Sequence, residues 1–384
     1  MSSPAPAEEI DEAKERAHFR AVVNAFKYYK LCSLDRIHKS EKIISTLPQS
    51  HQRRLEKYKT YLSKFKKCLD VNNSVVHMII KDVDTMFENV DHSVEDTADT
   101  NGTSTENFGC NYNNCEISSQ KQHKMQHDVE KVQSVLKNIV RDWSEAGAPE
   151  REQCYKPILD EIEARFPPHE YSDRSHVKVL VPGAGLGRLA WEVAARGYTC
   201  QGNEFSLFML FASNFILNRC PEPNKHTVHP WVHQYVNHAT CEHQLRAEPF
   251  PDVAIADSRC RRLCIAAGDF LKVYTEPEEW SCVATCFFID CAPNVIEFIE
   301  RIYGILRPGG YWINLGPLLY HYSDMPTENS IEPPYDILLE IITDVGFEIL
   351  KERTGVKTKY AQNPNSMMQH EYDSVFFVCR KPYV

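Results

Sequence analysis

The segment His176–Ser206 limits most strongly what this chain can fold into; its sequence is HVKVLVPGAGLGRLAWEVAARGYTCQGNEFS. An apolar run typical of a buried strand is followed by glycines in the spacing G-x-G-x-G, a helical pattern and a second strand that ends at Glu204. Glycine lets the backbone turn sharply and approach a ligand, and the following helix offers free N–H groups. A carboxylate about 20 residues beyond the first glycine can accept hydrogen bonds from ribose hydroxyls. The segment predicts a nucleoside-binding βαβ unit in which Gly183, Gly185 and Glu204 contact the ligand.

The glycine spacing differs from the G-x-G-x-x-G of dinucleotide-binding proteins and favours a smaller adenosyl ligand. A further predicted strand, Leu263–Phe270, ends in Gly-Asp-Phe. Asp269 can accept a hydrogen bond from an exocyclic amine there, and the ring of Phe270 can cover an adenine face. We therefore predict that both residues contribute to the same nucleoside site.

Asp290 lies near the end of a fourth predicted strand, Trp280–Ala292. In open α/β sheets ligands collect beyond the carboxyl ends of the strands, so we expect Asp290 to face the same site as Glu204. The remaining pattern alternates in the same way. It predicts a helix over Val295–Leu306, closed by Arg307–Gly310, a strand over Tyr311–Leu315, a helix over Tyr335–Val345, and a closing strand pair over Phe347–Arg353 and Ser374–Arg380. The fold class predicted is α/β.

Three regions differ in composition. Residues 1–91 carry apolar stripes at helical spacing and predict an N-terminal helical region. Residues 92–128 are rich in polar side chains and are predicted to form a disordered insert, because they cannot bury enough apolar surface. Residues 129–384 contain the strands described above and are predicted to form the catalytic domain.

The length, charge and cysteine content agree with a soluble intracellular enzyme. A formal net charge of −10 argues against a nucleic-acid-binding surface over the whole protein. No apolar run reaches the about 18 residues of a membrane span. The 14 cysteines are scattered, and several lie inside buried-strand patterns, so we expect reduced thiols. These features predict a cytosolic location, with the nucleus as an alternative, and leave open whether the protein is a homodimer.

One segment invites a metal interpretation, because histidine and cysteine side chains are ligands that zinc accepts. The residues concerned are His226, His229, His233, His238, Cys241 and His243. Their spacing is uneven and no C-x-x-C accompanies them, so we predict no metal site. The alternative is a segment that covers the surface of the domain.

The chain resembles class I S-adenosylmethionine-dependent methyltransferases and, more narrowly, the carnosine N-methyltransferase family. The glycine block is shared by many methyltransferases, whereas FFIDCAPN and GPLLYH are much more specific. The closer match also includes RDWS, GNEFS and GDF, and it covers most of the chain apart from the extreme N-terminus and the polar insert. The resemblance implies a seven-stranded Rossmann-like sheet and S-adenosylmethionine as cofactor. It also implies methyl transfer to an imidazole nitrogen of carnosine, which gives anserine.

Methyl transfer of this kind requires that the attacking nitrogen, the methyl carbon and the sulfur lie in line, and that the protein stabilises the positive charge that develops on the acceptor ring. The attacking imidazole must be neutral, and it becomes cationic as the methyl arrives, so a carboxylate placed beside it favours the reaction. Asp290 suits this role; its alternative is a helix-capping aspartate. The resemblance implies that His321 and Tyr372 contact the dipeptide, His321 either by orienting the ring or by relaying its proton. Tyr360 is a weaker candidate for such a contact.

Arg141 is a candidate partner for the methionine carboxylate of the cofactor, because guanidinium and carboxylate pair bidentately. An ion pair that ties the helical region to the catalytic domain is the alternative. Two other functions also stay open. One is a methyltransferase for a histidine or another nitrogen in a protein or small metabolite, and the other is a non-catalytic sensor or scaffold that binds S-adenosylmethionine.

Overall fold

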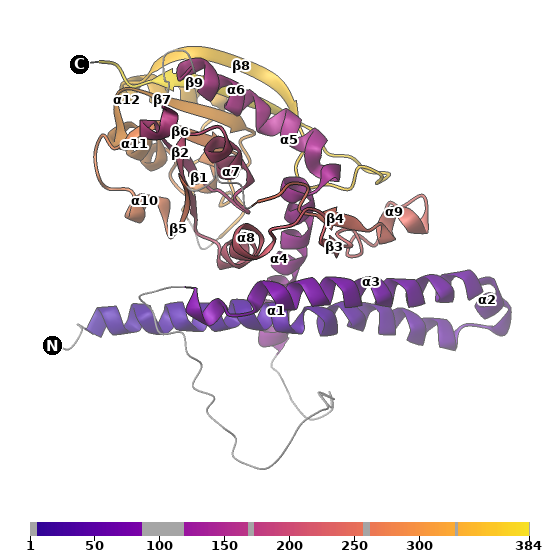
Figure 1. The fold of residues 1–384 in the computed structure, drawn as a ribbon. Helices are drawn as coiled ribbons and strands as arrows, with labels where there is room; N and C mark the ends of the chain where they lie inside the picture. Colours follow the sequence, from indigo (N-terminus) through magenta and orange to yellow (C-terminus); the bar gives the residue numbers. More distant parts are fainter. Residues whose placement is uncertain (1–5, 87–118, 168–172, 256–261, 327–328, 384) are drawn as a thin grey trace.

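The computed structural model describes residues 6–86, 119–167, 173–255, 262–326 and 329–383. A seven-stranded sheet with helices on both faces stands above a long helical hairpin (Figure 1). Its strands are β1 (Lys178–Pro182), β2 (Thr199–Glu204), β5 (Leu263–Ala267), β6 (Trp280–Cys286), β7 (Leu306–Gly316), β8 (Glu348–Thr358) and β9 (Tyr372–Arg380). A separate two-stranded sheet pairs β3 (His226–Val228) with β4 (Glu248–Phe250). The predicted α/β fold with a seven-stranded Rossmann-like sheet is confirmed.

The strand order is β5-β2-β1-β6-β7-β9-β8. All neighbouring pairs from β5 to β7 are parallel, and β9 runs antiparallel to both β7 and β8. From β1 the chain moves outward through β2 to β5, and it then returns to place β6 on the other side of β1. The strand order therefore reverses between β1 and β6, where the carboxyl ends of the strands leave a crevice for a ligand.

Successive residues of each central strand point to opposite faces of the sheet, as the pleat requires. Val179 and Val181 of β1 pack on one face, whereas Leu180 packs on the other. One face is covered by α5 (Ala148–Cys154), α6 (Lys156–Arg165) and α7 (Arg188–Ala195), and the other by α10 (Phe270–Val273), α11 (Val295–Ile305) and α12 (Tyr335–Val345). Burial on both faces explains why the strands read as continuous apolar runs.

Several strand boundaries differ from the predictions, and β8 and β9 are longer than predicted. β6 ends at Cys286, and Asp290 lies in a short 3₁₀ turn, η5 (Ile289–Cys291). Phe287 has a positive φ of 54°, which turns the chain out of the sheet before that point. β5 ends at Ala267, so Asp269 precedes α10 rather than ending a strand. β7 begins at Leu306 and includes the glycines predicted to form a turn.

The N-terminal region is helical, as predicted. It contains α1 (Pro6–Thr46), α2 (Gln49–Arg54) and α3 (Glu56–Ile80), followed by the 3₁₀ turn η1 (Val83–Thr85). Figure 1 shows α1 and α3 side by side, with α4 (Ser119–Trp143) rising from them toward the sheet. The start of α4 corrects the predicted insert: residues 119–128 belong to this helix, and residues 87–118 lie outside the described residues.

The helical hairpin and the catalytic half share one hydrophobic core. Phe26 of α1 stacks on Phe208 of α8 (Leu207–Arg219), with ring centroids 5.8 Å apart, and Phe19 meets Phe211 edge to face at 5.4 Å. The same core includes Trp143 at the end of α4 and Leu186 in the glycine loop. The indole of Trp143 donates to the carbonyl of Leu186 at 3.0 Å. The sequence composition thus divides the chain into a helical region and a catalytic domain, but in the structure these two parts pack together.

A buried polar network also joins the two halves. The side-chain amide of Asn72 donates to Tyr29 Oη at 3.0 Å and to the carbonyl of His229 at 2.9 Å, and its oxygen accepts from His229 N at 2.7 Å. Tyr29 Oη in turn lies 2.7 Å from His233 Nε2. Burial lowers the pKa of His233 to about 3, so its ring is neutral in this network.

Replacing Asn72 by alanine is expected to destabilise the protein by about 1–3 kcal/mol, because the backbone of His229 loses its partners in a buried place. The midpoint of chemical denaturation followed by circular dichroism measures this change. Ser74→Ala is the matched control, since Ser74 lies exposed on the same helix and its loss is expected to cost less than about 0.5 kcal/mol. Equal midpoints for the two variants would contradict the stabilising role of Asn72.

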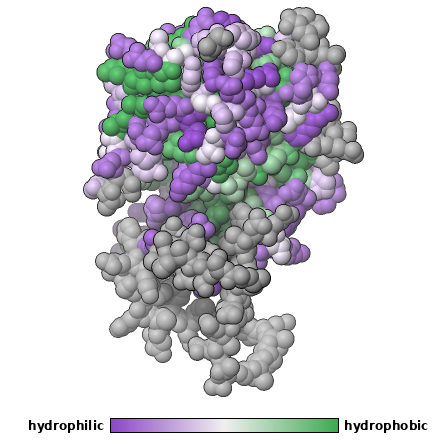
Figure 2. All heavy atoms as spheres, turned by 90° about the vertical axis from the view of Figure 1, so that its left-hand side faces the viewer, coloured by the Kyte–Doolittle hydropathy of each residue, from purple (hydrophilic) through white to green (hydrophobic). Residues whose placement is uncertain are grey.

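The face of the molecule that carries α10, α11 and α12 mixes polar and apolar side chains. Figure 2 shows its apolar patches separated by hydrophilic side chains. Within the part of the chain that the structure describes, no helix combines the length and apolar character of a membrane span.

Candidate active site

The glycine loop after β1 forms the floor of a pocket. Gly183 and Gly185 both have positive φ, 64° and 56°, a region that favours glycine. A Cβ on Gly183 would come within 2.5 Å of the ring of Phe288, so the close approach itself requires glycine. The pocket is lined by Asn138, Arg141, Asp142, Tyr155, Val181, Pro182, Gly183, Ala184, Gly185, Leu189, Met209, Cys286, Phe287 and Tyr360. Three predicted cofactor residues, Arg141, Gly183 and Gly185, thus meet in one place.

Glu204 is fixed at the end of β2 by backbone donors. Its Oε1 accepts from the N–H groups of Phe205 at 2.9 Å and Ser206 at 2.8 Å, and its Oε2 accepts from Gly185 N at 2.8 Å. Burial raises the pKa of this carboxyl above its usual value, and the three N–H donors oppose that rise. Glu204 therefore ties the glycine loop to the strand end that is expected to hold the ribose.

Asp269 and Phe270 lie beside Glu204 in the neighbouring strand connection. The N–H of Gly268 donates to the carbonyl of Glu204 at 2.9 Å, and Asp269 caps α10 by accepting from Leu271 N at 3.0 Å. The ring of Phe270 is only 3% exposed and packs in the core beneath α11. This differs from the prediction that the ring covers adenine; its backbone N–H, at the start of the helix, is the group left for a ligand.

Phe205 is an exposed aromatic residue that the sequence analysis left unassigned. It follows Glu204 directly, and 74% of it is exposed to solvent. Its position immediately after Glu204, the acid predicted to bind ribose, was the available signal. An exposed ring at this place offers the apolar face that the buried Phe270 does not.

Arg141 has two kinds of contact. Its Nη1 donates to Asp142 Oδ1 at 2.9 Å and to Tyr155 Oη at 2.5 Å, which supports the structural alternative. Its Nε is buried without a hydrogen-bond partner and lies 3.9 Å from a carboxylate oxygen of Glu150. A buried donor without an acceptor beside the glycine loop fits the carboxylate of S-adenosylmethionine. The two interpretations of Arg141 therefore use different nitrogens of one guanidinium.

Asp290 and His321 come together at the ends of β6 and β7. Asp290 is 1% exposed, and its Oδ2 accepts from Leu319 N at 2.7 Å. The N–H of His321 donates to the carbonyl of Asp290 at 3.0 Å, which holds the two segments in register, while the His321 side chain is exposed. Burial raises the pKa of the Asp290 carboxyl, and the N–H of Leu319 and the charge of His321 oppose that rise.

Phe287 lies in the segment that joins β6 to Asp290 and also lines the glycine pocket; the sequence analysis did not predict it as a site residue. Its ring lies 5.9 Å from that of Tyr372 at the start of β9 and 5.1 Å from that of Tyr360. The guanidinium carbon of Arg141 lies 4.5 Å from the ring centre of Tyr360. The aromatic side chains thus gather at the glycine pocket, which Phe287 and Tyr360 line. A positive φ at a bulky residue was the relevant feature, and sequence alone does not reveal it.

The histidine-rich segment is held by structural contacts. His229 Nδ1 lies 2.8 Å from the carbonyl of Leu245, His233 contacts Tyr29, and His238 Nε2 contacts the carbonyl of Gln234. Among the residues the structure describes, only Asp290, Cys291 and His321 form a group of potential metal ligands with suitable spacing. None of the six residues singled out by the sequence belongs to it.

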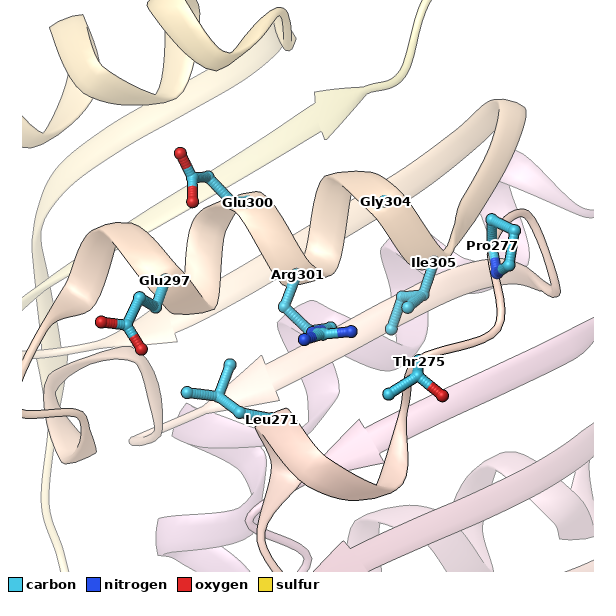
Figure 3. A pocket seen from close by; sticks show the side chains of 8 residues that line it. All are labelled: Leu271, Thr275, Pro277, Glu297, Glu300, Arg301, Gly304 and Ile305. Carbon is cyan, nitrogen blue, oxygen red and sulfur yellow. The ribbon is translucent and has the colours of Figure 1, made fainter.

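A separate pocket of about 360 Å³ lies between α10 and α11. Figure 3 shows Arg301 extending into it between α11 and the segment with Leu271 and Thr275, whereas Glu300 points away. Arg301 donates to the carbonyl of Tyr274 at 2.9 Å. No residue predicted for the site lines this pocket, so its polar groups serve the packing of α11.

Comparison with known proteins identifies the family. The family model described as carnosine N-methyltransferase matches residues 118–383. The carnosine N-methyltransferase of Drosophila melanogaster (unmet) is 47% identical over 374 residues, which is 97% of this chain and 81% of that protein. The carnosine N-methyltransferase of Mus musculus is 43% identical over 378 residues, which is 97% of this chain and 88% of that protein. The chain belongs to the carnosine N-methyltransferase family.

Proposed function

We infer that this protein transfers the methyl group of S-adenosylmethionine to an imidazole nitrogen of carnosine and thereby forms anserine. The family match over residues 118–383, with relatives that are 43–47% identical over nearly the whole chain, carries the inference. The residues present fit the cofactor, because Arg141, with its unpaired buried Nε, and the glycine loop line one pocket, and the carboxylate of Glu204 is bonded to Gly185 of that loop. S-adenosylmethionine supplies an electrophilic methyl group, so the protein's main task is alignment.

Arg141, the glycine loop, Glu204 and Asp269 bind and orient the cofactor. The acceptor imidazole lies against Asp290 and His321, with Tyr372 and Phe287 excluding water from one side. Asp290 Oδ2 is occupied by the N–H of Leu319, so Oδ1 is the oxygen that can face the ring. A fixed carboxylate at this place favours the positive charge that develops on the ring during transfer. His321 orients the ring or receives its proton.

One experiment tests both the identity of the methyl acceptor and the alternative that the protein is a non-catalytic sensor. Purified protein is incubated with methyl-labelled S-adenosylmethionine and carnosine, homocarnosine, histidine or histidine-containing peptides, and the products are identified by mass spectrometry and NMR. We expect transfer to carnosine with the highest kcat/KM of the panel. Faster labelling of a peptide histidine would assign the protein acceptor instead. Tight cofactor binding without any transfer would identify a sensor.

The rate of transfer is expected to rise with pH from the acidic side. Two groups must lose a proton: the substrate imidazole, whose ordinary pKa is about 6.5, and Asp290, whose pKa is raised by burial above the ordinary value of about 3.9. Both competent fractions increase with pH, so acid can only lower kcat. Single-turnover rates over pH measure this, and Asp290→Asn should lose one of the two proton dependences. An unchanged profile in that variant would contradict the assignment.

A further inference from the structure

Cys291 follows Asp290 directly in the chain and has no part in the reaction derived above. Its Sγ is 4.0 Å from Asp290 Oδ1, the carboxylate oxygen that Leu319 leaves free. Burial raises the pKa of the thiol, and the charges of Asp290 and Glu204 raise it further. The sulfur thus lies directly beside a carboxylate, and a ring nitrogen of the exposed His321 lies within 4.8 Å of it.

Asp290, Cys291 and His321 offer a carboxylate oxygen, a sulfur and an imidazole nitrogen, and these three atoms lie within 4.8 Å of one another. Zinc takes sulfur at about 2.3 Å and nitrogen or oxygen at about 2.0–2.2 Å, so tetrahedral ligand atoms lie roughly 3.3–3.8 Å apart. The ring of His321 is free to make this small approach because its side chain is exposed. The bond from Leu319 N to Asp290 Oδ2 orients the carboxylate as outer partners do in zinc sites.

We propose that these three residues form a zinc-binding site in which the metal blocks methyl transfer. Three protein ligands leave the fourth position open, as in sites that keep water or a substrate group. Zinc held there occupies the oxygen of Asp290 and the ring of His321 that the acceptor imidazole needs. Coordination removes the thiol proton, because a bound metal ion deprotonates a coordinating thiol. The inhibitory half of this proposal rests on the proposed function; the binding half does not.

Metal binding is measured directly on the full chain. Calorimetric titration with zinc is expected to show one site, and Co²⁺ in its place is expected to give the absorption typical of thiolate coordination. Cys291→Ala and Cys291→Ser should lose that absorption and bind zinc at least about tenfold more weakly. Cys264→Ala, an exposed cysteine on β5, and Cys241→Ala, an exposed cysteine in the histidine-rich segment, are matched controls that should retain both signals. Unchanged binding of S-adenosylmethionine shows that a variant is folded.

Inhibition is measured as single-turnover methylation of carnosine in zinc-buffered solution, since the substrate imidazole also binds zinc. Each variant is compared with its own metal-free rate. Zinc should inhibit the unaltered protein and the two control variants in competition with carnosine, and it should inhibit Cys291→Ala at least about tenfold less strongly. A cobalt signal that persists in Cys291→Ala, or that disappears in Cys241→Ala, would overturn the site. Zinc that binds through Cys291 without inhibiting would overturn the inhibitory role, and absent methylation with intact zinc binding would instead refute the proposed function.

Discussion

Replacing Asp290 by asparagine is expected to slow methyl transfer to carnosine at least about a hundredfold while S-adenosylmethionine binds as before. The substitution keeps the size of the side chain and one acceptor oxygen, and it removes the charge that favours the cationic ring. Because that charge develops only during transfer, the loss should appear in kcat rather than in the binding of either substrate. Single-turnover rates at saturating carnosine, with calorimetric titration of the cofactor, measure the two quantities.

The matched control is Asp324→Asn, the same change at an exposed aspartate in the loop that follows His321. It is expected to leave the rate within about twofold, since an exposed charge is screened by solvent and salt. Near-normal turnover in Asp290→Asn would remove its electrostatic role. Alignment of the two substrates would then have to account for the catalysis.

Glu204→Ala is expected to weaken S-adenosylmethionine binding by about 1.5–3 kcal/mol, which is roughly a 10- to 150-fold loss of affinity. The carboxylate supplies the expected hydrogen bonds to the ribose and also accepts from Gly185 N, so its loss loosens the glycine loop. Glu204→Gln keeps one acceptor oxygen, so its affinity for S-adenosylmethionine should lie between those of the unaltered protein and Glu204→Ala. Calorimetric titration measures the affinity, and Glu300→Ala on the exposed side of α11 serves as the control. Unchanged affinity in a folded Glu204→Ala protein would be incompatible with this assignment.

That Gly183, Gly185 and Glu204 come together could be predicted from sequence because the determinants of this arrangement are local. The strand, the glycines, the helix and Glu204 lie within one short segment, and the positive φ of Gly183 and Gly185 follows from the residue type. The position of Asp290 was predicted less well. The apolar residues after Cys286 continue the pattern of a buried strand, although the chain leaves the sheet at Phe287. Periodicity cannot distinguish a buried strand from a buried turn over so few residues.

Contacts between distant segments could not be predicted at all. Asn72 and His229 are 157 positions apart, and nothing in either neighbourhood shows that they pair. The ring of Phe270 was assigned to adenine because it follows an acid at a strand end, yet its neighbours Phe288 and Phe298 come from a later part of the chain. Tertiary packing thus decided between two uses of the same aromatic residue. The beginning of α4 was missed because its first turns are polar and lack an apolar stripe.

A fragment that begins at residue 129 would present to water the apolar side chains that α8 buries against α1, among them Phe208 and Phe211. Exposed apolar surface of this kind promotes association between copies. It would also free α4, which carries Arg141 into the cofactor pocket, from the helices that hold its other end. The hairpin and the methyltransferase half therefore depend on each other to bury their shared apolar surface. Replacing the hairpin by another domain would require simultaneous changes on the faces of α4 and α8 that pack against it. A module appended on a flexible linker could be replaced without such changes.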